Sequence, residues 1–201
     1  MTTMIYINKY NAPEVDEKEV LRYANGESND ATLSLLDSCI LESRDLLSYN
    51  VCYARYNITV LGDEIDLGFC RVTSHSLALC LCECSEIILF GATVGSGIDR
   101  LINRYSIVTP SRAVMLQALG SERVEALCDV FCSDMAEMEG TRGNLLRPRF
   151  SPGYGDLSLE VQRDIFDALD LTRKIGINLN DNLFMTPTKS VTAIVGIKRG
   201  K

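Results

Sequence analysis

Residues 147–197 read RPRFSPGYGDLSLEVQRDIFDALDLTRKIGINLNDNLFMTPTKSVTAIVGI, and the predicted fold class depends most on this stretch. It opens inside an irregular segment, residues 139–157, whose glycines, prolines and arginines follow no helical or strand period. A helix and two strands follow, in an order typical of an α+β domain rather than of regular βαβ alternation. These expected elements are a helix capped by Asp156 or Ser158 and ending near Gly176, and a terminal hairpin of Leu183–Met185 and Val191–Ile197 around the turn TPTK.

The preceding residues add helices, a hairpin and one isolated middle strand. Thr109-Pro110, an N-cap followed by proline at the first helical position, opens a long helix to about Met138. The other expected elements are helices after Pro13, after Asn29 or Asp30, after Ser74 and over Ile98–Tyr105, a hairpin of Val51–Leu61 with Ile65–Phe69, and a strand at Glu86–Phe90. The predicted fold class is therefore α+β, with a mainly antiparallel sheet flanked by helices.

We expect one domain over residues 1–201. Residues 1–105 would supply N-terminal helices, the hairpin and the middle strand, and residues 106–201 the long helix, the irregular loop and the terminal strands. A chain of 201 residues that is 46% hydrophobic can bury a substantial core.

Net charge and the lengths of the apolar runs limit the kinds of partner that we expect. Twenty basic residues stand against 27 acidic ones, for a net charge of −7, so we expect no nucleic-acid partner. No apolar run approaches membrane-spanning length, and no secretory signal opens the sequence, so we expect a cytoplasmic protein without a membrane partner. The eight cysteines then read as reduced, mostly buried thiols.

Two other patterns suggest different chemistry. FGATVGSG, residues 90–97, resembles a dinucleotide-binding loop, but no βαβ unit precedes it and no acidic residue follows a clear second strand, so a tight strand-to-helix turn is the preferred interpretation. Cys80, Cys82 and Cys84 suggest a thiol-based metal or redox protein. Their single-residue spacing is not that of CxxC zinc sites, so we predict no metal site and keep the redox function as a less favoured alternative.

The irregular segment contains the most informative motif, RxxxGY, at residues 149–154. An arginine such as Arg149 can hold a carboxylate with two parallel hydrogen bonds. Gly153 lets a ligand approach the backbone, and the ring of Tyr154 can lie against a cationic group. Together these properties suit an amino-acid-like ligand with a positive centre, although a Pro-Gly turn with a packed tyrosine explains the motif equally well.

Residues 147–197 resemble the reactivation (activation) domain of cobalamin-dependent methionine synthase, and more closely its free-standing bacterial form. The likeness runs through RxxxGY, the helix, IGI-x-L, MTPTKSV and the final strand. ILFGATVGSGIDRLINRYS and ALGSERVEALCD extend it over most of the chain. The resemblance implies a methyltransferase that needs a partner: it would reactivate cobalamin-dependent methionine synthase by S-adenosylmethionine-dependent reductive methylation of cob(II)alamin.

The resemblance also implies residue roles. Arg149 would hold the ligand carboxylate, the backbone near Ser151 and Gly153 would line the ligand, and Glu125 would be an acidic residue close to it. Tyr154, the residue assigned to catalysis, would contact the ligand near the cofactor face. Ser121 stands where the family has a second acidic residue.

Partners follow from the same resemblance. The sequence has no DxHxxG motif, so cobalamin would be carried by a cobalamin-binding methionine synthase protein, with an electron donor such as flavodoxin. The family's domain has further aromatic ligand contacts past the position of Lys201, so we expect weaker S-adenosylmethionine binding or binding completed by a partner. A non-catalytic interaction protein that kept the fold is the alternative function.

Overall fold

The computed structural model describes residues 3–200. The main sheet has five strands in the order β1-β2-β6-β10-β7, and every neighbouring pair is antiparallel. Two small sheets, β3-β4-β5 and β8-β9, lie outside it. The strands are β1 (Ile5–Tyr10), β2 (Tyr49–Asn57), β3 (Thr59–Leu61), β4 (Glu64–Asp66), β5 (Arg71–Thr73), β6 (Cys84–Thr93), β7 (Asn144–Leu146), β8 (Asn178–Leu179), β9 (Met185–Thr186) and β10 (Ser190–Arg199).

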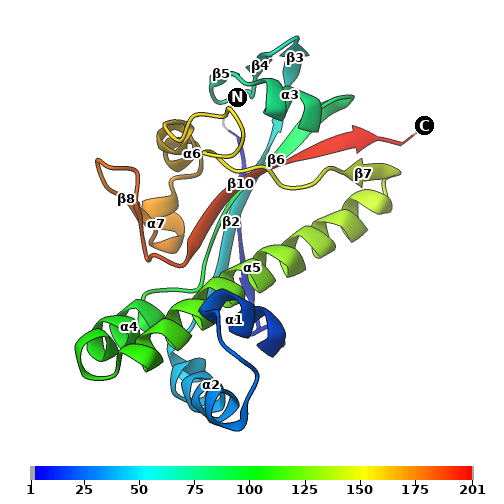
Figure 1. Cartoon of the computed structure of the whole chain (residues 1–201). Helices are drawn as coiled ribbons and strands as arrows, with labels where there is room; N and C mark the ends of the chain where they lie inside the picture. Colours follow the sequence, from blue (N-terminus) through cyan, green and yellow to red (C-terminus); the bar gives the residue numbers. More distant parts are fainter. Residues whose placement is uncertain (1–2, 201) are drawn as a thin grey trace.

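Helices cover both faces of the main sheet (Figure 1). One face carries α1, α2, α4 and α5, and the other carries α3, α6 and α7. The helices are α1 (Glu17–Ala24), α2 (Asp30–Ser43) with the 3-10 turn η1 (Arg44–Leu46), α3 (His75–Cys80), α4 (Gly97–Val108), α5 (Pro110–Gly140), α6 (Val161–Leu169) and α7 (Leu171–Ile175). The structure thus confirms an α+β fold with an antiparallel sheet flanked by helices.

The central strands are buried on both faces because their apolar residues are continuous rather than alternating with polar ones. In β6, Ile88 and Phe90 enter the core beneath α5, while Ile87 and Leu89 enter the core beneath α6 and α7. A strand buried in this way needs helices covering both faces of the sheet. The 31 residues of α5 supply one cover and run across the sheet in Figure 1.

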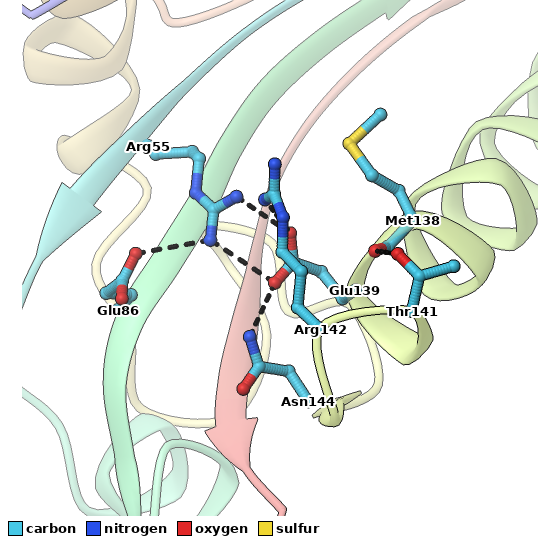
Figure 2. A network of polar contacts seen from close by, with 7 residues as sticks. All are labelled: Arg55, Glu86, Met138, Glu139, Thr141, Arg142 and Asn144. Carbon is cyan, nitrogen blue, oxygen red and sulfur yellow. Dashed lines mark hydrogen bonds and ion pairs between the residues drawn. The ribbon is translucent and has the colours of Figure 1, made fainter.

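The far end of α5 is fastened to the sheet by one carboxylate. Glu139, only 1% exposed, accepts hydrogen bonds from Arg55 of β2 at 2.7 Å, from Arg142 at 2.7 Å and from Asn144 of β7 at 2.8 Å. Figure 2 shows these donors converging on it, with Glu86 of β6 on the far side of Arg55. The network joins α5 to strands of the main sheet.

The middle of α5 holds the segment before α1. Arg123, 2% exposed, donates to the carbonyls of Pro13 and Glu14 and pairs with Glu122. The helix expected directly after Pro13 therefore begins later, at Glu17. There the Asp16 side chain caps it by accepting from the amides of Lys18 and Glu19.

The terminal hairpin prediction is wrong. β9 pairs with β8, whereas β10 pairs with β6 and β7. The segment between β9 and β10 is held by other elements: Thr188 donates to Asp99 of α4, and the Lys189 carbonyl accepts from the Val94 amide. These contacts direct the chain along β6 instead of back along β9.

Among residues 3–200, no helix is both long enough and apolar enough to cross a membrane.

Candidate functional site

The loop that carries RxxxGY continues the edge of the main sheet. After β7, the amide of Arg147 donates to Gly196 of β10 at 2.8 Å, and Phe150 exchanges two backbone hydrogen bonds of 2.8 Å with Ile194. Beyond Phe150 the backbone leaves β10 and turns back on itself. Arg149 is therefore fixed at the point where the loop leaves the sheet.

The rest of the loop is closed by its own hydrogen bonds. The amide of Gly153 donates to Leu157 at 2.9 Å, and that of Tyr154 donates to Ser151 at 3.2 Å. Gly153 has φ +88°, a left-handed backbone conformation that favours glycine. The Gly-Tyr part of the motif thus forms a compact turn that presents Tyr154 to solvent, with 69% of the side chain exposed.

Asp156 closes the far end of the loop and corrects a prediction. Its carboxylate accepts from the Ser74 hydroxyl at 2.6 Å and from the amides of His75 at 2.8 Å and Ser76 at 3.1 Å, so it caps α3. These hydrogen bonds, the one from Ser74 first, hold the pKa of Asp156 well below its usual range. The next helix, α6, begins only at Val161, so neither Asp156 nor Ser158 caps it.

Arg149 faces two carboxylates on α5. Its Nη2 donates to Glu125 Oε2 and to Asp129 Oδ1, each at 2.8 Å. Glu125 and Asp129 are four residues apart and so share one face of the helix. Arg149 Nη1 is buried and has no hydrogen-bond partner among residues 3–200. A buried guanidinium nitrogen without an acceptor is costly, so a ligand oxygen placed there would be bound favourably.

The surroundings keep Arg149 charged. Burial by itself lowers the pKa of the guanidinium, but the anionic groups around it, Glu125 and Asp129 among them, act in the opposite direction, and the pKa of Arg149 is raised. The neighbouring Cys128 is protonated at neutral pH, because burial raises the pKa of its thiol. The site therefore presents one fixed cation beside two anions.

Arg149 and Glu125, but not Asp129, line a cavity of about 220 Å³. Of the sequence-predicted site residues, Glu125, Arg149, Ser151 and Tyr154 line the cavity together. Gly153 shapes the loop but does not line the cavity. Ser121 lies one helical turn before Glu125, where its hydroxyl accepts from Lys189.

Sequence reasoning missed part of the lining. Phe150 and Val191 also line the cavity, and Asp129 shares Arg149 with Glu125. The i, i+4 spacing of Glu125 and Asp129 on a predicted helix was a usable signal for Asp129. Val191 had none, because its place depends on the pairing of β10.

A larger hollow of about 520 Å³ adjoins the cavity, because Glu125 and Arg149 line both. Its walls come from α5, α1 and the segment before α1, and most of their polar groups are carboxylates. The acidic residues among them are Glu14, Asp16, Glu19, Glu122, Glu125 and Asp129. A cationic ligand group is therefore favoured on this side of Arg149.

The glycines of residues 90–97 serve close packing, as the strand-to-helix interpretation predicts. A Cβ atom on Gly91 would lie 2.7 Å from a Leu171 methyl group, and one on Gly97 would lie 2.0 Å from the Leu46 carbonyl oxygen. The strand before this turn, β6, is antiparallel to both neighbours, unlike the parallel strands of a dinucleotide-binding sheet.

Seven of the eight thiols are buried or partly buried, and Cys82 is exposed. Burial raises the pKa of Cys52 to about 11 and that of Cys70 to about 12, so both are protonated at neutral pH. Within residues 3–200, no three His, Cys, Asp or Glu side chains are grouped so that they could hold a metal ion.

The fold and this site define a class: an α+β domain whose antiparallel sheet is covered on both faces and bears a small ligand cavity at its edge. The chain is similar to the crystal structure of the MetH reactivation domain bound to AdoHcy, with a TM-score of 0.67 and 12% sequence identity over 96% of this chain and 78% of the other. The chain thus has the fold of the MetH reactivation domain, which confirms the fold implied by the resemblance. No protein-family model matches the sequence, and no curated protein matches it either.

Proposed function

We propose that this protein reactivates a cobalamin-dependent methionine synthase by presenting the methyl group of S-adenosylmethionine to cob(II)alamin held on a partner protein. The observation that carries the proposal is the arrangement at Arg149. Arg149 lines a cavity together with Glu125 and the exposed Tyr154, and its Nη1 is buried without a hydrogen-bond partner among residues 3–200. The fold shared with a reactivation domain bound to AdoHcy agrees with a ligand of this kind.

The residues fit a zwitterionic ligand with an additional positive centre. The carboxylate of S-adenosylmethionine would accept from Arg149 Nη1 and so satisfy the buried donor. Glu125 and Asp129 would attract the ammonium or sulfonium group. Tyr154 would lie at the cavity mouth, with its ring available to the incoming cofactor.

The proposed methyl transfer needs little acid–base catalysis from this chain. One electron, from a donor such as flavodoxin, reduces the cobalt(II) substrate; the cobalt then takes the methyl carbon as the carbon–sulfur bond breaks, and S-adenosylhomocysteine leaves. Such a transfer depends chiefly on alignment of the sulfur, the methyl carbon and the cobalt. Holding the ligand at Arg149 beneath Tyr154 would provide this alignment.

Calorimetric titration with S-adenosylmethionine tests the site. We expect Arg149→Ala to weaken binding roughly 10- to 100-fold, the equivalent of a lost charge-assisted hydrogen bond. Arg173→Ala, which removes an exposed arginine on α7, is the matched control and should bind as the wild type does. Equal binding by wild type and Arg149→Ala would refute the assigned carboxylate site.

A second variant tests the acidic side. Glu125→Gln should weaken S-adenosylmethionine more than S-adenosylhomocysteine, because only the former carries the sulfonium charge. Methyl transfer is then measured from the absorbance of cobalamin on the partner protein with a one-electron reductant. No transfer by a wild-type protein that binds S-adenosylmethionine would reject the reactivation function.

A non-catalytic interaction protein remains the second candidate. The observation that favours it is that Glu125 and Asp129 already occupy Arg149 Nη2, and that a serine stands at position 121. A partner complex unchanged by Arg149→Ala and Tyr154→Phe would support it. Methyl transfer to cobalamin would exclude it.

A further inference from the structure

Lys189 is a half-buried lysine that directly precedes β10, the strand whose pairing with β6 is the longest in the main sheet. Its carbonyl accepts from the Val94 amide at 3.2 Å, which fixes the backbone just before β10. Its stem packs against Gly120 of α5, where an added Cβ atom would lie 3.0 Å from Lys189 Cγ. Because Gly120 has no side chain, there is room for the aliphatic stem of Lys189. The ammonium group reaches Ser121, the next residue of α5.

The ammonium group has no counter-ion within ion-pair distance among residues 3–200. It carries three N–H donors, and Ser121 Oγ, at 2.9 Å, is its hydrogen-bond acceptor. No carboxylate of residues 3–200 forms an ion pair with it. Burial lowers the pKa of Lys189 and outweighs the opposite effect of the nearby Asp99. The two carboxylate oxygens of Asp99 accept hydrogen bonds from Thr188 instead, at 2.8 and 2.6 Å.

The same lysine lines a groove of about 430 Å³ between α4, α5 and α1. Its walls are mostly apolar, and the rim at Val114 is 52% exposed and open to an incoming molecule. Apolar wall residues include Ile102, Ala113, Val114 and Ala118, with Gln117 and Ser121 as polar neighbours of Lys189. An ammonium group with too few hydrogen-bond acceptors, at the edge of an apolar groove, suits a ligand that has both an anionic group and an apolar body.

We propose that this groove is a second binding site, which takes a carboxylate or phosphate group attached to an apolar body, with the anion at Lys189. The inference goes beyond the proposed function, because the Arg149 cavity does not include Lys189, Gln117 or Val114. The anion would supply the acceptors that Ser121 alone does not. The apolar body would cover the walls formed by α4 and α5.

The probes are hexanoate and hexyl phosphate, titrated separately into the full chain and followed by amide NMR shifts. We expect saturable shifts of residues 114–121 for at least one of the two anions. Lys189→Met should bind that anion at least roughly tenfold more weakly, since it loses the charged donor but keeps an apolar stem. Lys174→Met, an exposed lysine on α7, is the matched control and should bind as the wild type does.

Further variants and a cationic probe distinguish binding in this groove from binding in the Arg149 cavity. Arg149→Ala should keep the affinity for the bound anion, and Val114→Glu should lower it by placing a negative charge at the rim. Hexylamine, with the same apolar body and a cationic head, should cause no saturable shifts of residues 114–121, whatever it does in the acidic hollow beside Arg149. The proposal is overturned by the absence of saturable shifts, by equal affinity in Lys189→Met, by hexylamine causing the same saturable shifts of residues 114–121, or by loss of binding in Arg149→Ala. These outcomes leave the S-adenosylmethionine titration unaffected.

Discussion

At the scale of single residues, Glu139 makes the hydrogen bonds that attach the C-terminal end of α5 to strands of the main sheet. Its carboxylate is 1% exposed and is shared by Arg55, Arg142 and Asn144, which belong to different segments (Figure 2). Burial alone raises the pKa of Glu139, but the hydrogen bonds from Asn144 and Arg55 and the two arginine charges outweigh it, so the pKa is lowered. The folded protein is therefore stabilised by the charged, carboxylate form of Glu139.

Glu139→Gln should lower the free energy of unfolding by about 2 kcal/mol, because Arg142 loses its anionic partner and Arg55 keeps only Glu86. The estimate stays at the lower end of the range for buried pairs, since Arg142 is about half exposed to water. Urea denaturation at neutral pH measures the change. Glu137→Gln, at an exposed position of the same helix, is the control and should leave the stability unchanged.

The pH dependence has a definite sign. Because the folded pKa of Glu139 lies below the ordinary value of 4.5, its contribution is complete above that value and is lost as the pH falls through the folded pKa. The stability difference between wild type and Glu139→Gln should therefore be constant near neutrality and shrink below about pH 4.5. A difference that grows on acidification would contradict the assigned ion pairs.

At the scale of elements, the turn from β6 to α4 is a closely packed junction. Gly97 starts α4 against the carbonyl of Leu46, and that contact leaves no space for a methyl group. Gly97→Ala should cost about 2 kcal/mol or more, because backbone atoms must move apart. Gly140→Ala, in the last turn of α5 with nothing within 4 Å of the added carbon, should stabilise by about 0.5 kcal/mol. Thermal unfolding of the two variants gives the comparison, and equal effects would contradict this account.

Elements with local signals could be predicted from the sequence. Asn29 and Ser74 cap α2 and α3 through their own side chains, and Pro110 opens α5, as expected. The errors arose where distant segments decide the structure. β1 forms because β2 offers an edge to pair with, and Asp156 caps α3, 80 residues earlier in the chain, instead of the helix that follows it.

The candidate site follows the same division. Arg149, Ser151, Tyr154 and Glu125 could be brought together from motif and resemblance, and the structure places them around one cavity. Val191 and Lys189 could not be assigned from the sequence, because their positions depend on β10 pairing with β6 rather than with β9. Long-range strand pairing is the information that a single sequence does not display.

At the scale of the whole molecule, the two cores meet through the three inner strands. β2, β6 and β10 each place side chains in both cores, whereas β1 is an edge strand of the main sheet and β3-β4-β5 form a separate small sheet. We expect the slowest hydrogen exchange in β2, β6 and β10, near the rate set by global unfolding, and faster exchange in β1 and β3-β5. Native-state exchange followed by NMR measures this order, and protection of β1 equal to that of β6 would contradict it.

The single-domain organisation of residues 1–201 stays a prediction at this scale. Both halves contribute strands to the main sheet, since β1, β2 and β6 precede residue 106 and β7 and β10 follow it. One unfolding transition, coincident by fluorescence and circular dichroism, is therefore expected. Two separate transitions would divide the chain into independent units.

The self-closed loop after Phe150 has a practical consequence for protein engineering. The backbone of residues 151–157 forms hydrogen bonds within the segment, Asp156 attaches the far end to α3, and the attachment to β10 is made just before the segment, by Arg147 and Phe150. Such a segment can be exchanged as a cassette, with the graft points at Phe150 and Asp156 kept. Ligand preference could then be altered by loop libraries without redesigning the scaffold beneath them.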